Sequence, residues 1–397
     1  MMLFDAVIIG GGPAGSQSAK IIADYGFKTL VIEEDSEVGK PQHCAGLISI
    51  SGLHKLGLNE SKPFVLNKIN GARFFAPNTN SFIVSRNDYV AVVIDRILFD
   101  KFLEKNALSA GAEYIYNTKA ISISRTQKKW KVKAINRRNG EKKSIFAKII
   151  IDAEGRIGAI RRFAGLTHHV RILPAFQYVV SDVSDVDEKL VELYFDTDLA
   201  KDFFLWVIPI SKNAARVGLA TSKGNPKALL DQFMTKSNYS YKFSNVKTLD
   251  AFGGGVITSG PIPKYYAPGF LVVGDAAGHV KPTTGGGIIL GGICAKIAAE
   301  VAIDALEKDI FSEKFLAQYQ RRCNQILGKH FKSMKIVRWW LNKLSNKGYN
   351  RLFKYIKEKE ITNLLELYGD MDMQEGVIKK LLLNPKFLIN LLYTTLL

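Results

Sequence analysis

Cysteine is scarce in this chain of 397 residues, which contains only Cys44, Cys294 and Cys323. Three scattered thiols do not provide the disulfide framework of a small secreted domain, and their spacing is not that of a metal-binding cluster. We therefore expect a cytoplasmic protein without a metal site.

Long apolar runs are also missing from the sequence. The nearest one, residues 285–305, contains Lys296 and Glu300, so no segment predicts a helix that crosses a membrane. Residues 1–10 are apolar, but they lack the basic segment of a secretory signal and lead into a glycine-rich turn. They are predicted to form a strand.

Acidic residues are few relative to basic ones: 37 Asp and Glu occur with 55 Lys and Arg, which gives a net charge of +18. The excess is concentrated in residues 321–359, where twelve basic residues occur with one acidic residue. Such a region favours an anionic partner, whether a phospholipid surface, an acidic protein or a nucleic acid. The basic stretch contains no RNA-binding motif, so we expect no nucleic-acid partner.

The same basic region contains a predicted amphipathic helix. Basic side chains share one face and apolar side chains are available for another: Lys343, Lys347, Arg351 and Lys354, then Leu344, Leu352, Phe353 and Ile356. The pattern suits a helix that lies on an anionic lipid surface, and it equally suits the solvated face of an ordinary helical cap.

Only one dinucleotide-binding fingerprint is present, in residues 5–33. A buried strand leads into Gly10-x-Gly12-x-x-Gly15, and a helix and a second strand that ends at Glu33 follow. Gly10 permits the tight turn, Gly12 lets the backbone approach a pyrophosphate, and Gly15 lets the helix pack closely on the strand. Glu33 is placed to accept hydrogen bonds from a ribose diol.

A second glycine-rich element begins with the apolar run of residues 269–278 and continues into a helix of small residues. Asp275 can accept a hydrogen bond from a polyol hydroxyl, while the amides of Gly286, Gly287 and Ile288 can face an anionic oxygen. A nicotinamide dehydrogenase does not need this second element, whereas a protein that binds extended FAD does. The sequence therefore favours FAD over NAD.

Two regions between these elements predict a separate sheet. Residues 69–94 alternate weakly between apolar and polar positions, and residues 175–221 contain several aromatic-rich strands. The aromatic residues are either an ordinary β-core or the wall of an apolar pocket. Cys44 lies in a loop directly after the acid at the ribose position, and it is either an inert thiol or a functional one.

The sequence thus predicts an α/β fold in three parts. They are a Rossmann-like FAD-binding domain (residues 1–68, 95–170 and 250–310), an inserted mixed-sheet substrate domain (residues 69–94 and 171–249) and a basic helical C-terminal segment (residues 311–397).

The order of these motifs resembles that of the geranylgeranyl reductase family, which has an FAD fold of the p-hydroxybenzoate hydroxylase type. The likeness covers residues 5–310. Residues 274–288 are similar to the family's G-D-A-A…P-x-T-G-G-G-I element. Residues 40–49 resemble its flavin-proximal loop, with Cys44 at the position of its cysteine, and residues 95–103 resemble its R-x-x-F-D-x-x-L helix start, with Arg96 as the arginine.

The resemblance implies functional residues that the motifs alone do not assign. Cys44 is expected to be catalytic, as a proton donor or a positioning group. Together, the motifs and the resemblance place the following residues at FAD: Gly10, Gly12, Ala14, Gly15, Glu33, Cys44, Ala45, Leu47, Arg96, Ala120, Asp275, Gly287 and Ile288. The run from Phe204 to Pro209 resembles the family's Y-x-W-x-F-P motif and implies substrate contacts by Phe204, Trp206, Ile208 and Pro209.

The sequence departs from the family pattern at several positions. Glu154 stands where the fold usually has aspartate, and Gly158 where it usually has serine. Phe204 and Ile208 replace the tyrosine and phenylalanine of the substrate motif. Residues 45–47 differ from the glycine-and-acid version of the flavin loop, so a close paralogue that acts on another prenyl chain is an alternative.

The resemblance implies an FAD-dependent reductase that saturates isolated double bonds of geranylgeranyl chains, on membrane lipids of the digeranylgeranylglycerophospholipid kind. We expect an external electron donor, either a reduced carrier protein or NAD(P)H, and peripheral binding to anionic lipid at the inner face of the cell membrane. The main alternative is an FAD monooxygenase that hydroxylates an aromatic or quinone ring. A basic, RNA-binding flavoprotein is a third reading.

Overall fold

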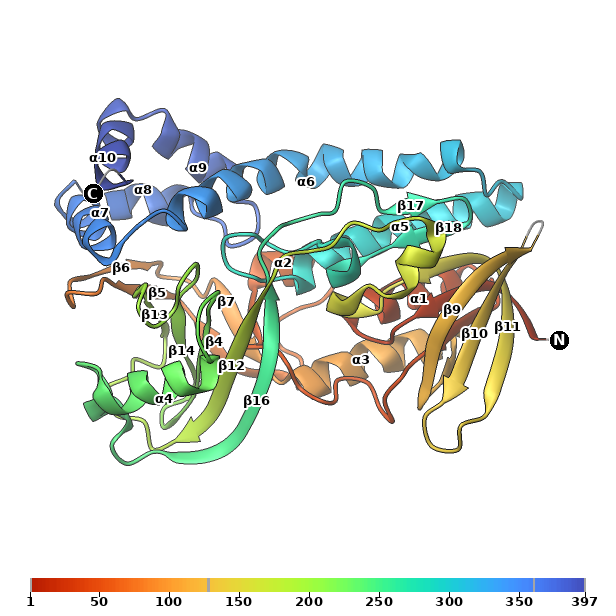
Figure 1. Ribbon diagram of the computed structural model, residues 1–397, viewed down its shortest axis with the longest axis horizontal. Coiled ribbons are helices and arrows are strands. Elements are labelled where there is room, and N and C mark those ends of the chain that lie inside the picture. The colour runs from red at the N-terminus through yellow and green to blue at the C-terminus, as the bar shows by residue number, and fades with distance from the viewer. Residues whose placement is uncertain (1, 127–128, 360, 396–397) are drawn as a thin grey trace. The chain divides into compact units, whose positions relative to one another are not determined.

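The computed structural model describes residues 2–126, 129–359 and 361–395 (Figure 1). The described chain divides into two compact units. The first consists of Met1–Gln42, Arg96–Arg171 and Ile257–Phe331, and the second of His43–Asp95, Ile172–Val256 and Lys332–Leu397.

This division differs from the predicted domain boundaries. Residues 311–331 belong to the first unit and not to a C-terminal segment. Residues 43–68 join the sheet-rich unit, because β3 (Leu47–Ser49) and β4 (Val65–Ile69) both pair with β7 (Ala91–Ile94). The described residues from 332 to 395 also join this unit, because apolar side chains among them pack into its core.

The first unit contains a sheet with the strand order β17-β18-β11-β1-β2-β8. Its strands are β1 (Met2–Ile9), β2 (Thr29–Ile32), β8 (Glu113–Ile115), β9 (Thr118–Thr126), β10 (Lys129–Asn136), β11 (Lys142–Asp152), β17 (Tyr266–Ala267) and β18 (Phe270–Val272). The neighbours β11, β1 and β2 run parallel, as a Rossmann-like domain requires. Residues 6–9 of β1 are buried on both faces, which explains their uninterrupted apolar run.

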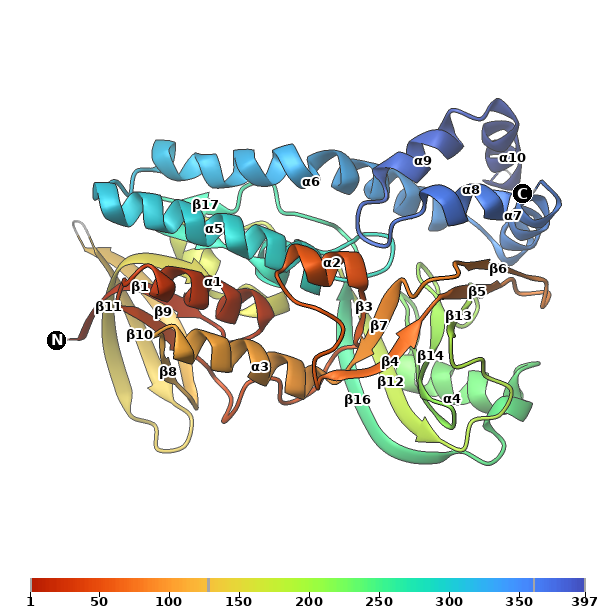
Figure 2. The same ribbon diagram turned by 180° about the vertical axis from the view of Figure 1, so that it is seen from behind.

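Among the described residues, four helices belong wholly or partly to the first unit: α1 (Pro13–Asp24), α3 (Arg96–Ser109), α5 (Ile288–Lys308) and α6 (Glu313–Leu341), which continues into the second unit. Both ribbon views show α1 and α5 side by side (Figures 1 and 2). Their contact is close because small residues line it, and Ser18 Oγ donates a hydrogen bond to Ala295 O at 3.2 Å. Three short 3-10 turns complete the unit: η1 (Gly155–Ile157), η2 (Ile160–Ala164) and η4 (Gly274–Ala277).

The second unit is built on a mixed sheet with the order β16-β12-β15-β14-β13-β5-β6. These strands are β5 (Gly71–Phe75), β6 (Ser81–Ser85), β12 (Ile172–Ser181), β13 (Leu190–Tyr194), β14 (Leu205–Ser211), β15 (Ala214–Ala220) and β16 (Lys247–Ile257). Its helices are α2 (Ile50–Lys55), α4 (Pro226–Lys236), α7 (Asn346–Glu358), α8 (Ile361–Tyr368), α9 (Glu375–Leu382) and α10 (Pro385–Thr395), and η3 (Ser240–Phe243) is a 3-10 turn.

The mixed sheet separates two apolar cores, and side chains alternate between them along β14. Leu205 and Val207 face a core that includes Leu230 and Phe233 of α4. Trp206 faces the opposite core, which we call the aromatic face. It consists of buried residues of the mixed sheet, of β7 and of the C-terminal helices. Its members on the C-terminal helices and the turns beside them include Leu344, Tyr349, Leu352, Phe353, Ile356, Ile361, Phe387 and Leu391.

The apolar face expected on the basic C-terminal helix is therefore not available to a membrane. Leu352, Phe353 and Ile356 of α7 are buried in the aromatic face, while Lys347 and Lys354 are exposed. Within the described part of the chain, no helix has both the length and the apolarity to span a bilayer.

Candidate functional site

The loop between β1 and α1 has the geometry that its three glycines predict. Gly10 has a φ of +99°, and a Cβ there would lie 2.4 Å from Ala153 O. A Cβ on Gly15 would lie 2.0 Å from Gly10 O, so the helix start packs directly on the turn. A Cβ on Gly12 would meet no atom within 4 Å, so this residue faces open space. The protein itself thus requires Gly10 and Gly15, whereas Gly12 leaves room for a ligand.

Glu33 lies at the end of β2 and is buried against the glycine loop. Its Oε2 accepts a hydrogen bond from Gly11 N–H at 2.7 Å, and its Oε1 accepts one from Asp35 N–H at 2.9 Å. Burial raises the pKa of the Glu33 carboxyl, and these two N–H donors oppose that rise. Each oxygen keeps a further lone pair, so the carboxylate can also accept hydrogen bonds from a diol.

The second glycine-rich element meets the first within the same unit. Gly274 of η4 packs against α1, since a Cβ on Gly274 would lie 3.1 Å from Ala14 Cβ. A Cβ on Gly287 would lie 2.8 Å from Asp275 Oδ1, which places this carboxylate at the start of α5. Neither α1 nor α5 has a side-chain N-cap or an acidic residue in its first turn. Their first N–H groups therefore suit an anion.

Two arginines contribute positive potential at Asp275. Burial raises the pKa of the Asp275 carboxyl, and the charges of Arg96 and Arg156 oppose that rise. Arg96 is the first residue of α3, and its Nη2 pairs with Asp100 Oδ2 at 3.0 Å. The structure thus brings the predicted Arg96 towards Asp275. The structure also brings Arg156 towards Asp275, a residue that the sequence analysis did not assign to the site. The indication in the sequence was its position in the basic turn after β11.

The departures at residues 154 and 158 have a structural explanation. Glu154 Oε1 accepts a hydrogen bond from Ile160 N–H at 2.5 Å, so the longer carboxylate holds the turn that follows it. Arg161 is 1% exposed and its Nη1 donates to Ala276 O at 3.0 Å. A Cβ on Gly158 would lie 1.2 Å from that same Nη1. The guanidinium therefore occupies the space that a serine would need.

The remaining predicted cofactor residue of the first unit is Ala120 on β9, which pairs with Ala134 on β10. Two residues earlier, Thr118 N–H donates to Glu33 O at 2.8 Å. This hydrogen bond links the start of β9 to Glu33, which follows β2 and is buried against the glycine loop. Among the predicted cofactor residues, Cys44, Ala45 and Leu47 instead belong to the second unit.

In the second unit, the predicted substrate motif lies on β14 and on the turn before it. Phe204, Trp206 and Ile208 are all buried in the aromatic face. Trp206 lies opposite Gly218 on β15, and a Cβ on Gly218 would come within 2.6 Å of the indole ring. The indole crosses over this glycine, and its Nε1 donates to Gln177 Oε1 on β12 at 2.8 Å. The ring is thus held over Gly218.

The Cys44 loop meets the same aromatic face. Ala45 and Leu47 are half-buried and pack against this core, and Gly46 N–H donates to Cys44 Sγ at 3.3 Å. The second unit therefore contains both the predicted catalytic residue and the predicted substrate motif, and neighbours of Cys44 pack against the core that holds the motif. Arg216 of β15, which the sequence reasoning missed, donates to Ala45 O at 2.7 Å. The indication of Arg216 in the sequence was a charged residue within an otherwise apolar strand.

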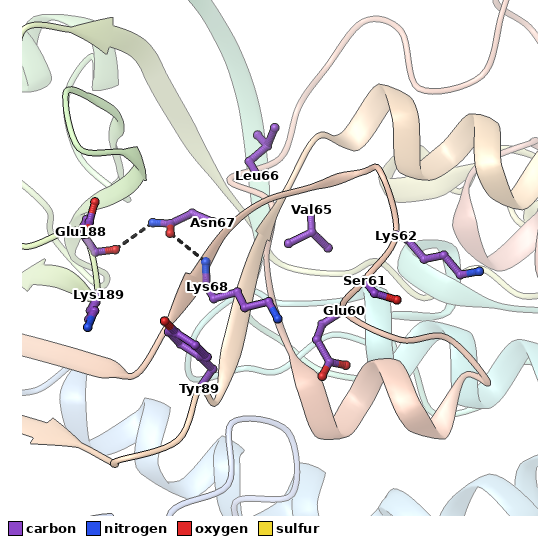
Figure 3. Close-up of a pocket in the computed structure, with 10 residues that line it drawn as sticks. All are labelled: Glu60, Ser61, Lys62, Val65, Leu66, Asn67, Lys68, Tyr89, Glu188 and Lys189. Atoms are coloured by element: carbon purple, nitrogen blue, oxygen red, sulfur yellow. Dashed lines mark hydrogen bonds between the residues drawn. The ribbon is translucent and has the colours of Figure 1, made fainter.

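A separate open cavity of about 520 Å³ also lies in the second unit (Figure 3). Polar side chains dominate its lining: Glu60, Ser61, Lys62, Asn67, Lys68, Tyr89, Glu188 and Lys189, with Val65 and Leu66. Asn67 Nδ2 donates to Glu188 O at 2.8 Å and to Pro209 O at 3.0 Å. Asn67 therefore links the cavity wall to Pro209, the last residue of the predicted substrate motif.

The other two cysteines are structural. Cys294 and Cys323 are 0% and 1% exposed, and burial raises the pKa of the Cys294 thiol well above its ordinary value. They lie near Tyr265 and Tyr319, two of the rings that pack around His279. Thiols in such surroundings are inert.

The first unit thus combines a Rossmann-like glycine loop with a second, convergent phosphate-and-polyol element, which defines an FAD-binding domain. A model of the FAD binding domain family matches residues 4–227, more than half of the chain. The residues at the loop fit the cofactor, because the space at Gly12 and the two uncapped helix starts suit a pyrophosphate. The cofactor of this flavoprotein is FAD.

Comparison with known proteins narrows the class further. The chain is 32% identical over 395 residues to the digeranylgeranylglycerophospholipid reductase of Methanocaldococcus jannaschii, covering 97% of each chain. It is 30% identical to that of Methanothrix thermoacetophila, covering 98% of each. The chain belongs to the digeranylgeranylglycerophospholipid reductase family, a family of flavin-dependent oxidoreductases.

Solved structures agree with this assignment. A geranylgeranyl bacteriochlorophyll reductase-like protein from Thermoplasma acidophilum superposes with a TM-score of 0.86 at 27% identity, covering 96% of this chain and 99% of that one. The p-nitrophenol 4-monooxygenase of Pseudomonas putida has a TM-score of 0.72 at 16% identity, covering 98% of this chain and 99% of that one. That second likeness shows the shared fold alone.

Proposed function

We propose that this protein is an FAD-dependent reductase that saturates isolated double bonds of geranylgeranyl chains on digeranylgeranylglycerophospholipid-type lipids. The observation that carries the proposal is its near full-length similarity to reductases of that name. The site supports it, because one unit has the FAD-binding elements and the other unit joins a cysteine loop to a buried apolar face.

The chemistry of an isolated alkene explains what the protein residues must add. When bound and reduced, FAD supplies a hydride equivalent to one alkene carbon. The other carbon must receive a proton, and no neighbouring carbonyl is available to stabilise charge. A donor therefore has to be held against an apolar chain with water excluded. We assign this task to the Cys44 thiol, as proton donor or as the group that positions the donor.

The prenyl chain is proposed to pack on residues of the aromatic face. Phe204, Trp206 and Ile208 are apolar and carry no hydroxyl, since phenylalanine replaces the family's tyrosine at 204. All three are buried, so the proposal requires the side chains packed over them to move apart when the prenyl chain binds. Pro209, tied to Asn67, ends this surface.

The lipid substrate also suggests where the protein works. We propose that it binds peripherally to anionic lipid at the inner face of the cell membrane through the exposed basic residues of α7, including Lys347, Lys354 and Lys357. Electrons are proposed to come from an external donor, either a reduced carrier protein or NAD(P)H.

The test is a single-turnover reaction. The purified flavoprotein is reduced with dithionite without air and mixed with geranylgeranyl lipids, and the products are analysed by mass spectrometry. We expect mass gains in steps of two hydrogens, and Cys44→Ser should retain FAD while losing most of this activity. A reduced, FAD-loaded protein that adds no hydrogen to any prenyl lipid would falsify the assignment. Consumption of O2 that depends on an aromatic substrate would instead establish the monooxygenase.

A further inference from the structure

A buried arginine stands on the aromatic face beside the substrate motif. Arg216 is 4% exposed and lies in β15 between Ala215 and Val217, which both face the opposite core. Arg216 therefore projects to the side of the sheet that holds Trp206. The antiparallel register places it directly opposite Ile208 of β14.

The guanidinium of Arg216 connects this face to the cysteine loop. Its Nη1 donates to Ala45 O at 2.7 Å and to Ile94 O at 3.0 Å. Ala45 follows Cys44 in the chain, and Ile94 N–H donates to Gly46 O at 2.8 Å where the β3–β7 pairing ends. Arg216 Nη1 therefore links the backbone at Ala45, in the cysteine loop, to the backbone at Ile94, at the end of β7.

The loop is shaped around the arginine. Gly46 has a φ of +70°, and a Cβ at this position would lie 2.3 Å from Arg216 Nη1 and 2.7 Å from Ile94 O. Only glycine satisfies both constraints. In this conformation Gly46 N–H reaches Cys44 Sγ at 3.3 Å. On the other side, the His43 ring Nδ1 lies 2.9 Å from Gly253 O of β16.

A buried guanidinium is costly, and an apolar side chain of similar length would fill the same space at lower cost. What it provides is two strong donors in a fixed planar geometry, directed at carbonyls beside the thiol. We propose that Arg216 is a positioning residue, which fixes the backbone around Cys44 and so holds the thiol in register with the motif of β14. The consequence for turnover rests on the proposed function, but the effect on the thiol does not.

The first test measures the reactivity of the Cys44 thiol and requires no turnover. Arg216→Lys and Arg216→Gln are compared with wild type for the rate of alkylation by iodoacetamide, followed on the Cys44 peptide by mass spectrometry. Cys294 and Cys323 are buried and should stay unmodified. The matched control is Arg338→Gln, which removes another buried arginine of this unit, one that donates to Asp202 O at 2.8 Å. Flavin content and the thermal unfolding midpoint establish that each variant folds.

We expect the Arg216 variants to change the alkylation rate at least about fivefold and the control less than twofold, because only the former release the loop. In turnover, kcat should fall about tenfold or more with KM for the lipid nearly unchanged, as expected when a reacting group is misplaced. Added guanidinium, well below denaturing concentrations, should partly restore kcat in Arg216→Ala. Purely structural damage would not be rescued in this way.

The proposal is overturned if both Arg216 variants keep the wild-type alkylation rate, or if the Arg338 control changes it equally. It is also overturned if KM alone changes. If Arg216→Gln does not fold, Arg216→Lys and Gly46→Ala, which displaces the guanidinium from the loop side, provide the same comparison. If wild type itself saturates no prenyl lipid, the proposed function fails, while the alkylation rates still decide the role of Arg216.

Discussion

At the scale of single residues, the glycines of the β1–α1 loop differ in what they serve. Gly15 is required by the protein, because a Cβ there would lie 2.0 Å from Gly10 O. Gly12 is not, because its Cβ position is open. Within the motif, the packing of the fold requires glycine at position 15, and the space for the ligand requires glycine at position 12. Substitutions at the two positions should therefore have different effects.

Gly12→Ala should weaken FAD binding with little effect on the stability of the apoprotein, whereas Gly15→Ala should destabilise the apoprotein. We expect at least about a tenfold loss of FAD affinity, or 1.4 kcal/mol, for Gly12→Ala. Overpacking at Gly15 should cost about 1–3 kcal/mol. Flavin titration and urea unfolding of the apoproteins measure the two effects. Equal behaviour of the two variants in both measurements would contradict the separation.

His279 offers a second prediction at this scale. Its ring is fully buried among aromatic side chains, and burial lowers its pKa to about 3. The ordinary pKa of histidine in an unfolded chain is about 6.5. Between these values the unfolded state binds one proton more than the folded state, so stability is lost as the pH falls from 6.5 towards 3. The slope should reach about 1.4 kcal/mol per pH unit.

Replacing His279 by phenylalanine should remove this contribution, and the stability-pH profile of the variant should be flatter below pH 6.5. Tyr265→Phe changes a neighbour in the same aromatic cluster without removing an imidazole, and it serves as the control. Urea unfolding at several pH values measures both profiles. An unchanged profile for His279→Phe would show that other groups account for acid sensitivity.

At the scale of elements, the register of β12, β15 and β14 brings together the residues of the proposed substrate surface. Gln177, Gly218 and Trp206 form one row across these strands. The missing side chain at Gly218 is what lets the indole reach Gln177. Such a row depends on strand pairing, which is why the sequence predicted Trp206 by resemblance but not its partners.

Gly218→Ala should displace the indole and raise KM for the prenyl lipid about tenfold, while flavin binding is retained. The control is Gly253→Ala on β16 of the same sheet, where a new Cβ would meet its nearest atom at an ordinary 3.8 Å. Steady-state kinetics and flavin content test both variants. If the two have the same KM, the indole does not contribute to lipid binding.

The sequence predicted the elements whose chemistry is local and missed those that depend on tertiary contacts. The strand–glycine–helix unit and the element at Asp275 are contiguous motifs, so their type and order could be predicted. The Arg216 contact with Ala45 spans 171 residues, and nothing in either segment specifies its partner. The apolar face of α7 was visible as a pattern, but a pattern does not distinguish burial against a sheet from burial in lipid.

At the scale of the whole molecule, the net charge of +18 predicts electrostatic binding to a membrane, whereas the amphipathic pattern of α7 suggested insertion of an apolar face. Because the apolar residues of α7 are buried in the aromatic face, the proposed membrane binding through α7 has to be mainly electrostatic. An interface of this kind weakens steeply with salt, whereas insertion of an apolar face does not.

Binding to vesicles that contain anionic lipid should therefore fall as the salt concentration rises, and it should be negligible on neutral vesicles. Each lysine near an anionic surface contributes about 1 kcal/mol, so Lys347→Gln, Lys354→Gln and Lys357→Gln combined should reduce partitioning about a hundredfold. Neutralising three exposed lysines of the first unit, Lys105, Lys133 and Lys142, changes the net charge equally and is the matched control. Sedimentation with vesicles measures all three proteins. An equal loss in both triple variants would mean that net charge alone drives binding, and salt-resistant binding would mean that apolar residues enter the lipid after all.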